Sequence, residues 1–183
     1  MIADKIELLR VLDDDGKETG EIRFRDEVHI KSLFHNEITL WVINKKDKKI
    51  LLQKRSEFKK IDPNKYAPCM GHVVENETIM ETLFKEAQEE LGIDLSKYKI
   101  VPLVVVKNSF PNNHHFSHHF YIVASIPISE IIIQKEELSE VLYMGFEKLK
   151  KLVVSNSPMI VFRNTGSDKI VLDALEDVIK SLK

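Results

Sequence analysis

The feature that most constrains this 183-residue sequence is one amphipathic segment near its middle, from Thr78 to Gly92. Thr78 and Glu81 have the spacing of a helix-capping box, and Gly92 stands where a C-terminal cap glycine belongs. Between them, apolar residues recur at helical spacing: Ile79, Met80, Leu83, Phe84, Ala87 and Leu91. The segment predicts a helix whose apolar face packs against the core.

Three glutamates lie on an adjoining arc of this helix. Glu86, Glu89 and Glu90 are related by spacings that make them neighbours on a helix surface. Carboxylates about 5 Å apart repel by roughly 3 kcal/mol per pair at an effective dielectric near 20, so a counter-charge is expected. Mg²⁺, which takes carboxylate, phosphate and water oxygens, would supply it. For a bare E-x-x-E-E, however, a solvated acidic face is the better interpretation.

The residues around the helix decide between these two interpretations. Gly71 is followed, at fixed distances, by Glu77, Lys85, Glu86, Ala87, Glu89, Glu90, Gly92 and Ile93. This pattern resembles the Nudix box, G-x5-E-x7-R-E-U-x-E-E-x-G-U, where U is aliphatic. Every defined position matches except one, where Lys85 replaces arginine. By this resemblance the chain is identified as a member of the Nudix family.

The resemblance implies a fold, a reaction and a set of site residues. The fold would be the α/β (in some schemes α+β) Nudix fold, a mixed β-sheet sandwiched between α-helices. The family pattern implies Mg²⁺ or Mn²⁺ bound by Glu89 and Glu90, with the carbonyl of Gly71. Glu86 would orient or deprotonate the attacking water, or act as a further metal ligand. Glu77 would pair with the basic residue that follows it, here a lysine that keeps the charge but lacks the planar fork of arginine.

The rest of the sequence predicts strands before and after the central helix. Apolar segments at 6–11, 38–43, 50–52, 100–106 and 120–124 read as strands, and the second and third form a hairpin. The segment 57–68 reads as a loop, and 146–153 and 169–182 as helices, the last capped by Ser167 or Asp168. We expect a single Nudix domain over residues 1–183, with an N-terminal strand extension (about 1–30) and a C-terminal helix (about 167–183).

Further segments resemble the isopentenyl-diphosphate isomerase branch of the family. They are residues 35–44, 51–55 with Lys59-Lys60 and Pro63, and Gly71-His72. In that branch, histidines matching His35 and His72 bind a metal together with a third histidine and acidic residues, and a catalytic cysteine precedes the box glycine. Here Met70 holds that position. Cys69 lies one residue earlier and would face the other side of an extended strand, as a buried or idle thiol.

Histidines and basic residues outside the box have two interpretations each. His35 and His72, with His118 or His119, could hold a second metal ion, since imidazole suits transition metals. Alternatively, 112–119 is a polar loop leading into the 120–124 strand, and His35 is a hydrogen-bonded strand histidine. The basic set Lys54, Arg55, Lys59 and Lys60 is either a diphosphate clamp or a solvated turn.

Composition narrows the class of function. A formal net charge of −2 argues against a general binder of nucleic-acid polymers. Cys69 is the only cysteine, no signal-peptide pattern opens the chain, and its apolar runs are too short to span a membrane. We therefore expect a cytoplasmic Mg²⁺- or Mn²⁺-dependent hydrolase of a small diphosphate substrate, X–diphosphate–Y, with a homodimer left open. The alternatives are an isomerase-like enzyme and a non-catalytic nucleotide-binding module.

Overall fold

The predicted central helix is present in the computed structural model, which describes residues 7–182. Helix α2 (Ile79–Leu91) begins at Thr78, whose side chain forms the complete capping box with Glu81, and ends at Gly92 in the left-handed conformation, φ 66°. Its buried face differs in part from the predicted stripe. Met80 and Phe84 are exposed. The helix is rotated so that the face that meets the sheet includes the polar residues Thr82 and Glu90 in their place. The buried residues are Thr82, Leu83, Ala87, Glu90 and Leu91.

Nine strands of the described residues form one mixed sheet, and β3 (Phe34–Ile43) lies at its centre. Along one edge β3 pairs in turn with β1, β6 and β4, all antiparallel, and along the other it pairs in parallel with β8 over its whole length. The turn between β3 and β4 is the predicted hairpin. The other strands and the short helices are β1 (Leu8–Leu12), β2 (Glu18–Phe24), α1 (Arg25–Ile30), β4 (Ile50–Arg55), β5 (Tyr66–Ala67), β6 (Cys69–His72), η1 (Leu95–Lys97), β7 (Val101–Phe110), β8 (Asn113–Val123), η2 (Ile128–Glu130) and β9 (Leu138–Met144).

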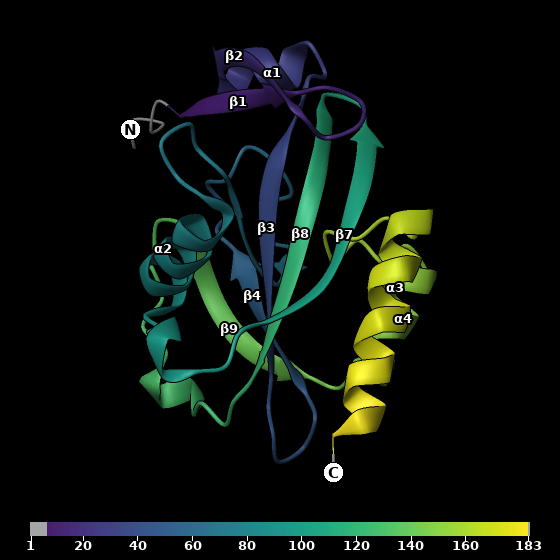
Figure 1. The fold of residues 1–183 in the computed structure, drawn as a ribbon. Helices are drawn as coiled ribbons and strands as arrows, with labels where there is room; N and C mark the ends of the chain where they lie inside the picture. Colours follow the sequence, from purple (N-terminus) through teal and green to yellow (C-terminus); the bar gives the residue numbers. More distant parts are fainter. Residues whose placement is uncertain (1–6, 183) are drawn as a thin grey trace.

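Alternation along β3 explains why helices cover both faces of the sheet. Ile38, Leu40 and Val42 point into the core beneath α2, whereas Trp41 and Ile43 point into the core beneath the two C-terminal helices. Figure 1 shows this sandwich, with α2 on one side of the sheet and α3 and α4 on the other. The predicted Nudix-type arrangement of a mixed sheet between helices is confirmed.

The two C-terminal helices agree with the sequence prediction in position. Helix α3 spans Phe146–Val154, and α4 spans Gly166–Ser181. The cap of α4 is Thr165 rather than the predicted Ser167 or Asp168. Asp168 instead completes a capping box with Thr165 from the third helical position. None of the helices in the described part of the chain is long and apolar enough to cross a membrane.

The histidine-rich segment is a strand and not the polar loop that was the alternative prediction. β7 and β8 form a long antiparallel hairpin whose turn lies at Pro111 and Asn112. His114 to His119 therefore alternate between the two faces of the sheet. Of the predicted N-terminal extension, β1, β2 and α1 lie across one end of the sheet, and residues 1–6 lie outside the described range (Figure 1).

Candidate functional site

The box glutamates line a large cavity whose wall includes residues of the central strands β3 and β8. Glu86, Glu89 and Glu90 line it together with Gly71, so the structure brings together all four residues of the predicted glutamate site. Gly71 on β6 packs directly against Glu86. A Cβ built at position 71 would lie 2.5 Å from Cγ of Glu86, so only glycine allows this approach.

Burial makes the negative charge of this group costly. Glu90 is 8% exposed, and its carboxylate accepts a hydrogen bond from Nε2 of Gln53 at 2.6 Å. Burial raises the pKa of Glu90. Burial, together with the charge of Glu90, raises the pKa of Glu86 to about 8. Several carboxylate oxygens gathered at one cavity, two of them on carboxyls whose ionisation is disfavoured by burial, are a donor set that fits a hard divalent ion such as Mg²⁺ or Mn²⁺.

The predicted pair of Glu77 with the basic residue on α2, Lys85, is present. Nζ of Lys85 lies 2.8 Å from Oε1 of Glu77, and the hydroxyl of Thr82 donates to the other oxygen of the same carboxylate at 2.9 Å. Lysine therefore takes the structural place of the box arginine through a single contact instead of a fork. The pair ties the loop before α2 to the middle of the helix.

Two of the four predicted phosphate-binding residues line the cavity. Arg55 and Lys59 line it, whereas Lys54 lies outside its lining, with its ammonium group 5.8 Å from the centre of the Tyr66 ring. Nε of Arg55 donates to the carbonyl of Ile61 at 3.1 Å. Lys59 forms an ion pair with Glu137, another residue of the cavity wall.

The structure brings together two members of the predicted histidine group and holds the other two apart from them. His35 and His72 do face one another, with ring centroids 5.3 Å apart. His118 instead points to the other side of β3 and binds Asn36, while Nδ1 of His119 accepts a hydrogen bond from the Trp41 indole at 3.1 Å.

The side chain that completes the histidine group is His29. It comes from α1, with its ring 5.3 Å from that of His35 and 5.2 Å from that of His72. Burial lowers the pKa of His29 to about 4 and that of His72 to about 3. Sequence reasoning missed His29 because α1 is a helix of six residues without its own periodic signal.

Cys69 and Met70 take opposite sides of β6, as their one-residue separation predicts. Cys69 is 3% exposed and belongs to the core beneath α2, where burial and the charges of Glu90 and Glu86 raise the pKa of its thiol well above the usual value. Met70 lines the cavity. The cavity wall at this point is therefore a thioether and not a thiol.

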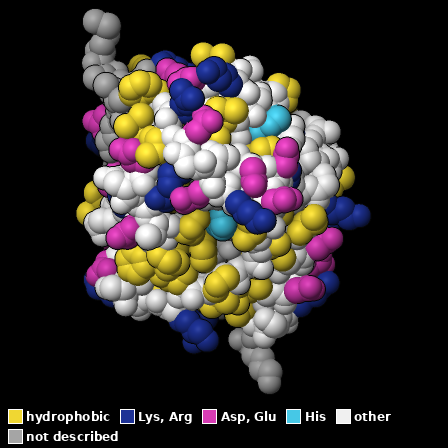
Figure 2. Space-filling view, turned by 45° about the horizontal axis from the view of Figure 1, so that its top comes forward, with side chains coloured by type: hydrophobic (Ala, Val, Ile, Leu, Met, Phe, Trp, Pro, Cys, Tyr) yellow, Lys and Arg dark blue, Asp and Glu magenta, His cyan; other side chains and the backbone are white. Residues whose placement is uncertain are grey.

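The whole cavity has a volume of about 1240 Å³ and is wider than the box alone suggested. Acidic, basic and histidine side chains lie close together on the face shown in Figure 2. Part of the cavity wall comes from the segment before α4 and from the first turns of α4, and here Arg163 lies 3.1 Å from Asp62 and 5.4 Å from the centre of the Phe110 ring. Sequence reasoning missed this wall, since no motif marks it. Its lining residues there are Val161, Phe162, Arg163, Asp168 and Val171.

Comparison with known proteins agrees with the box. A family model described as NUDIX domain matches residues 33–161. Nudix hydrolase 3 from Arabidopsis thaliana is 28% identical over 160 residues, which are 82% of this chain and 21% of that protein. An uncharacterized Nudix hydrolase from Clostridium acetobutylicum is 26% identical over 154 residues, 80% of this chain and 74% of that protein. The chain thus spans about a fifth of the length of the Arabidopsis relative.

The fold has solved counterparts as well. The crystal structure of DR0079 from Deinococcus radiodurans superposes with a TM-score of 0.71 at 16% identity, covering 96% of this chain and 99% of that one. At this identity the likeness concerns the fold. Because the family model spans most of the sequence and the relatives are Nudix hydrolases, this chain belongs to the Nudix hydrolase family.

Proposed function

We propose that the protein hydrolyses a diphosphate linkage in a nucleotide or related X–diphosphate–Y compound, with Mg²⁺ or Mn²⁺ at the box glutamates. The observation that carries this is the meeting of Glu86, Glu89, Glu90 and Gly71 at one cavity, where carboxylates are crowded and partly buried. A volume of about 1240 Å³ exceeds that of typical small-ligand pockets and suits a molecule of nucleotide size or larger.

In such a hydrolysis, each group of side chains would have a different role. The divalent ion, when bound, would neutralise charge on the phosphoryl oxygens. Glu89 and Glu90 would hold it, and Glu86, fixed against Gly71, would orient the attacking water. Arg55 and Lys59 line the same cavity and would be the cations that bind the phosphates.

The cavity supports hydrolysis more than isomerisation. The isomerase reaction of the resembling branch uses a cysteine before the box glycine, and here Met70 occupies the cavity while Cys69 is buried in the core. A non-catalytic module is the second alternative, and the complete set of box glutamates argues against it. We also propose that the described residues work as one unit, because the lining of the cavity runs from Glu7 to Val171. A cytoplasmic location and a homodimer stay predictions.

A substrate screen tests the proposal. Nucleoside triphosphates, dinucleotides, nucleotide sugars, coenzyme A and prenyl diphosphates are incubated with Mg²⁺ or Mn²⁺, and released phosphate and nucleotide products are measured. We expect metal-dependent cleavage of at least one class. Binding without turnover at any metal concentration would support the non-catalytic module. Proton exchange into isopentenyl diphosphate in deuterated water, followed by NMR, would support the isomerase.

A further inference from the structure

A short row of polar side chains, which we call the polar floor, lines the cavity on one face of the sheet. It consists of Thr39 on β3 and of Ser117 and His119 on β8. Thr39 and His119 are paired in register, and Ser117 lies two residues before His119 on the same face. All three side chains are buried. Farther along β3 this face turns apolar, with Trp41 in the core beneath the C-terminal helices. The polar floor therefore interrupts an otherwise apolar surface where the cavity begins.

The hydrogen bond between Trp41 and His119 fixes where the imidazole carries its proton. The indole N–H can only donate, and it donates to Nδ1 of His119 at 3.1 Å, so this nitrogen carries no proton. Burial lowers the pKa of His119 to about 3, so the ring is neutral at neutral pH. Its one proton is therefore on Nε2, and no described residue accepts it. His119 thus offers a fixed N–H donor to a ligand in the cavity.

Aromatic stacking holds this donor in place. The fully buried ring of Trp41 lies nearly parallel to that of His119, at 19° and with centroids 6.2 Å apart. It also stacks on Phe162, at 17° and 5.6 Å. Trp41 cannot turn without disturbing the core, so the imidazole that it contacts keeps one orientation. Phe162 itself lines the cavity and adds aromatic surface to the wall.

The other two residues of the polar floor offer a second donor. Oγ1 of Thr39 and Oγ of Ser117 lie 3.2 Å apart, and either hydroxyl can be the donor. One hydrogen bond between two hydroxyls uses one of their two protons, so the other proton remains for a ligand. The polar floor therefore holds two neighbouring donors, and neither of them carries a charge.

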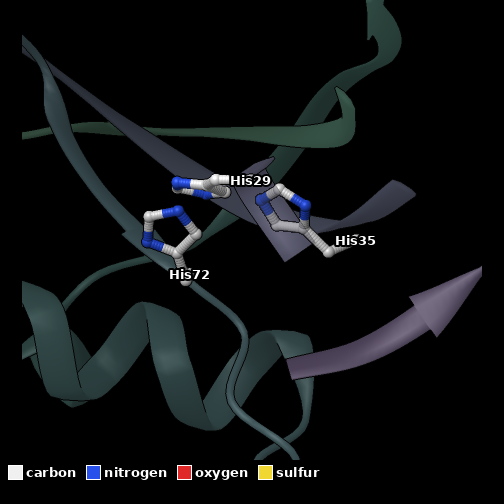
Figure 3. A group of neighbouring side chains, drawn as sticks. All are labelled: His29, His35 and His72. Atoms are coloured by element: carbon white, nitrogen blue, oxygen red, sulfur yellow. The ribbon is translucent and has the colours of Figure 1, made fainter. Parts of the chain in front are cut away.

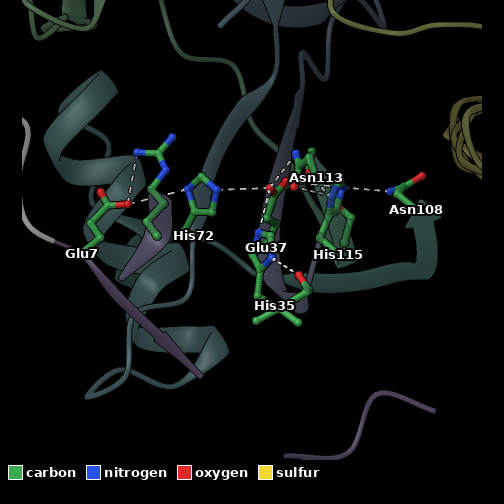
Figure 4. Close-up of polar contacts among 11 residues, drawn as sticks. Glu7, His35, Glu37, His72, Asn108, Asn113 and His115 are labelled. Carbon is green, nitrogen blue, oxygen red and sulfur yellow. Dashed lines mark hydrogen bonds and ion pairs between the residues drawn. The ribbon is translucent and has the colours of Figure 1, made fainter. Parts of the chain in front are cut away.

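The neighbour of the polar floor is an anion. Glu37 is paired in register with Ser117. Although burial opposes its ionisation, three histidines hold the pKa of Glu37 well below the usual range, and Figure 4 shows their contacts with it. Two of them, His35 and His72, also face His29 (Figure 3). An ionised carboxylate repels a phosphate, so the polar floor suits an uncharged part of a ligand.

We infer that the polar floor binds the edge of a planar heterocycle, such as the base of a nucleotide, whose ring nitrogen or carbonyl oxygen accepts the proton on Nε2 of His119. The inference rests on the proposed function, because it names the part of X–diphosphate–Y that is not phosphate. A prenyl chain has no acceptor and would leave both donors without a partner. Phe162 adds a surface of the kind on which bases of any sequence stack.

Binding of nucleoside 5′-monophosphates tests the inference without hydrolysis, because these compounds contain no diphosphate linkage. Dissociation constants for the adenosine, guanosine, cytidine and uridine compounds are measured by calorimetry on the full chain. Ribose 5-phosphate, which lacks a base, is the matched probe. We expect at least one nucleotide to bind about 10-fold more tightly than ribose 5-phosphate, since one hydrogen bond and one stacking contact contribute about this much.

Substitutions in the polar floor should reduce this preference for a base. His119→Ala should weaken binding of the preferred nucleotide by roughly 5- to 10-fold and leave ribose 5-phosphate unaffected. His119→Gln, whose amide still donates, should retain part of the preference. Thr39→Val and Ser117→Ala should each weaken it by roughly 2- to 5-fold. His118→Ala is the matched control, because His118 binds Asn36 on the other side of β3, and it should keep the full preference.

Far-UV circular dichroism checks that each variant is folded, since His119→Ala leaves the indole N–H of Trp41 without its acceptor. If that variant fails to fold, NMR of the wild-type imidazoles replaces it. The signals of His119 should then shift when the nucleotide is added and not when ribose 5-phosphate is added.

The outcomes separate this inference from the hydrolase function. Equal affinity for ribose 5-phosphate and all four nucleotides, or a preference that His119→Ala leaves unchanged, would overturn the inference even if hydrolysis is found. A wild-type NMR signal of His119 that does not respond to any nucleotide would do the same. A preference that depends on His119, with no cleavage of any compound in the substrate screen, would support the polar floor and contradict the hydrolase.

Discussion

Two carboxyl groups of the cavity wall, Glu86 and Glu37, have pKa values shifted in opposite directions. At the box, burial and the charge of Glu90 raise the pKa of Glu86 to about 8. Burial also opposes ionisation of Glu37, but the effects of His115, His35 and His72 are larger than that of burial. They hold the pKa of Glu37 well below its usual range. A cation at the box would relieve repulsion between carboxylates. At Glu37 the neighbouring histidines already stabilise the negative charge.

The largest expected effect comes from removing charge at the box. Glu89→Gln and Glu90→Gln should each lower kcat/KM by roughly 100-fold or more, because a metal ion contributes several kcal/mol to phosphoryl-transfer barriers. Steady-state kinetics on the substrate found in the screen measures this. Glu147→Gln, an exposed change on α3, is the control. Wild-type turnover in either box variant would remove these residues from the site.

Gly71→Ala tests whether the close approach to Glu86 matters. The new Cβ would lie 2.5 Å from Cγ of Glu86, so that side chain must move away. We expect activity to fall roughly 10- to 100-fold, since small displacements of catalytic groups cost about this much. Gly145→Ala is the matched control, because nothing lies within 4 Å of its Cβ. If Gly71→Ala retains full activity, the position of Glu86 is not critical.

In the absence of metal, substitutions of Glu86 and Glu37 should change the thermal stability of the protein in opposite directions. With its pKa raised to about 8, the buried Glu86 carboxyl must take up a proton when the chain folds at neutral pH. Glu86→Gln removes this cost, so we expect the melting temperature to rise by about 2–4 °C, equivalent to roughly 1 kcal/mol. Glu37→Gln removes a charge that the fold favours and should lower it. Thermal unfolding at neutral pH with a chelator measures both. Equal shifts of the same sign would contradict the contrast between the two carboxyl groups.

The smallest effect concerns a pair far from the cavity. Lys150 on α3, with further help from Lys180, lowers the pKa of Glu176 on α4 to about 2. Its stabilising contribution is therefore present above the ordinary value of 4.5 and is lost as pH falls from there toward about 2. Urea unfolding should show a small deficit for Glu176→Gln at pH 7 that vanishes near pH 2. A deficit independent of pH would assign the effect to packing.

Prediction from sequence succeeded where the determinants are local. The capping box, the glycine at the end of α2 and the three glutamates are all set by spacing within one helix. Local spacing does not determine which distant segments pair, and this is why the sequence did not predict that His29, rather than His118 or His119, lies beside His35 and His72. His29 reaches His35 only because α1 crosses the end of the sheet, and His119 is drawn away by Trp41.

The part of the cavity wall next to α4 was not predicted from the sequence, for a related reason. The segment before α4 has no motif, and it reaches the cavity through single long-range contacts such as Arg163 with Asp62. Likewise, the almost entirely polar run 113–119 reads as a loop until β7 and β3 are known to flank it. In each case, what the residue faces depends on a neighbour that the local sequence does not contain.

The parallel pairing of β3 with β8 has a consequence for how the protein reaches its native state. Contacts such as that between Trp41 and His119 join positions 78 residues apart. Closing so long a loop lowers the conformational entropy of the chain before the contacts can form. Ribosomal synthesis releases β3, with His35 and Glu37, well before β8. We therefore expect slow folding in which His35 and Glu37 gain their neighbours on β8 only at the late step when β8 docks beside β3.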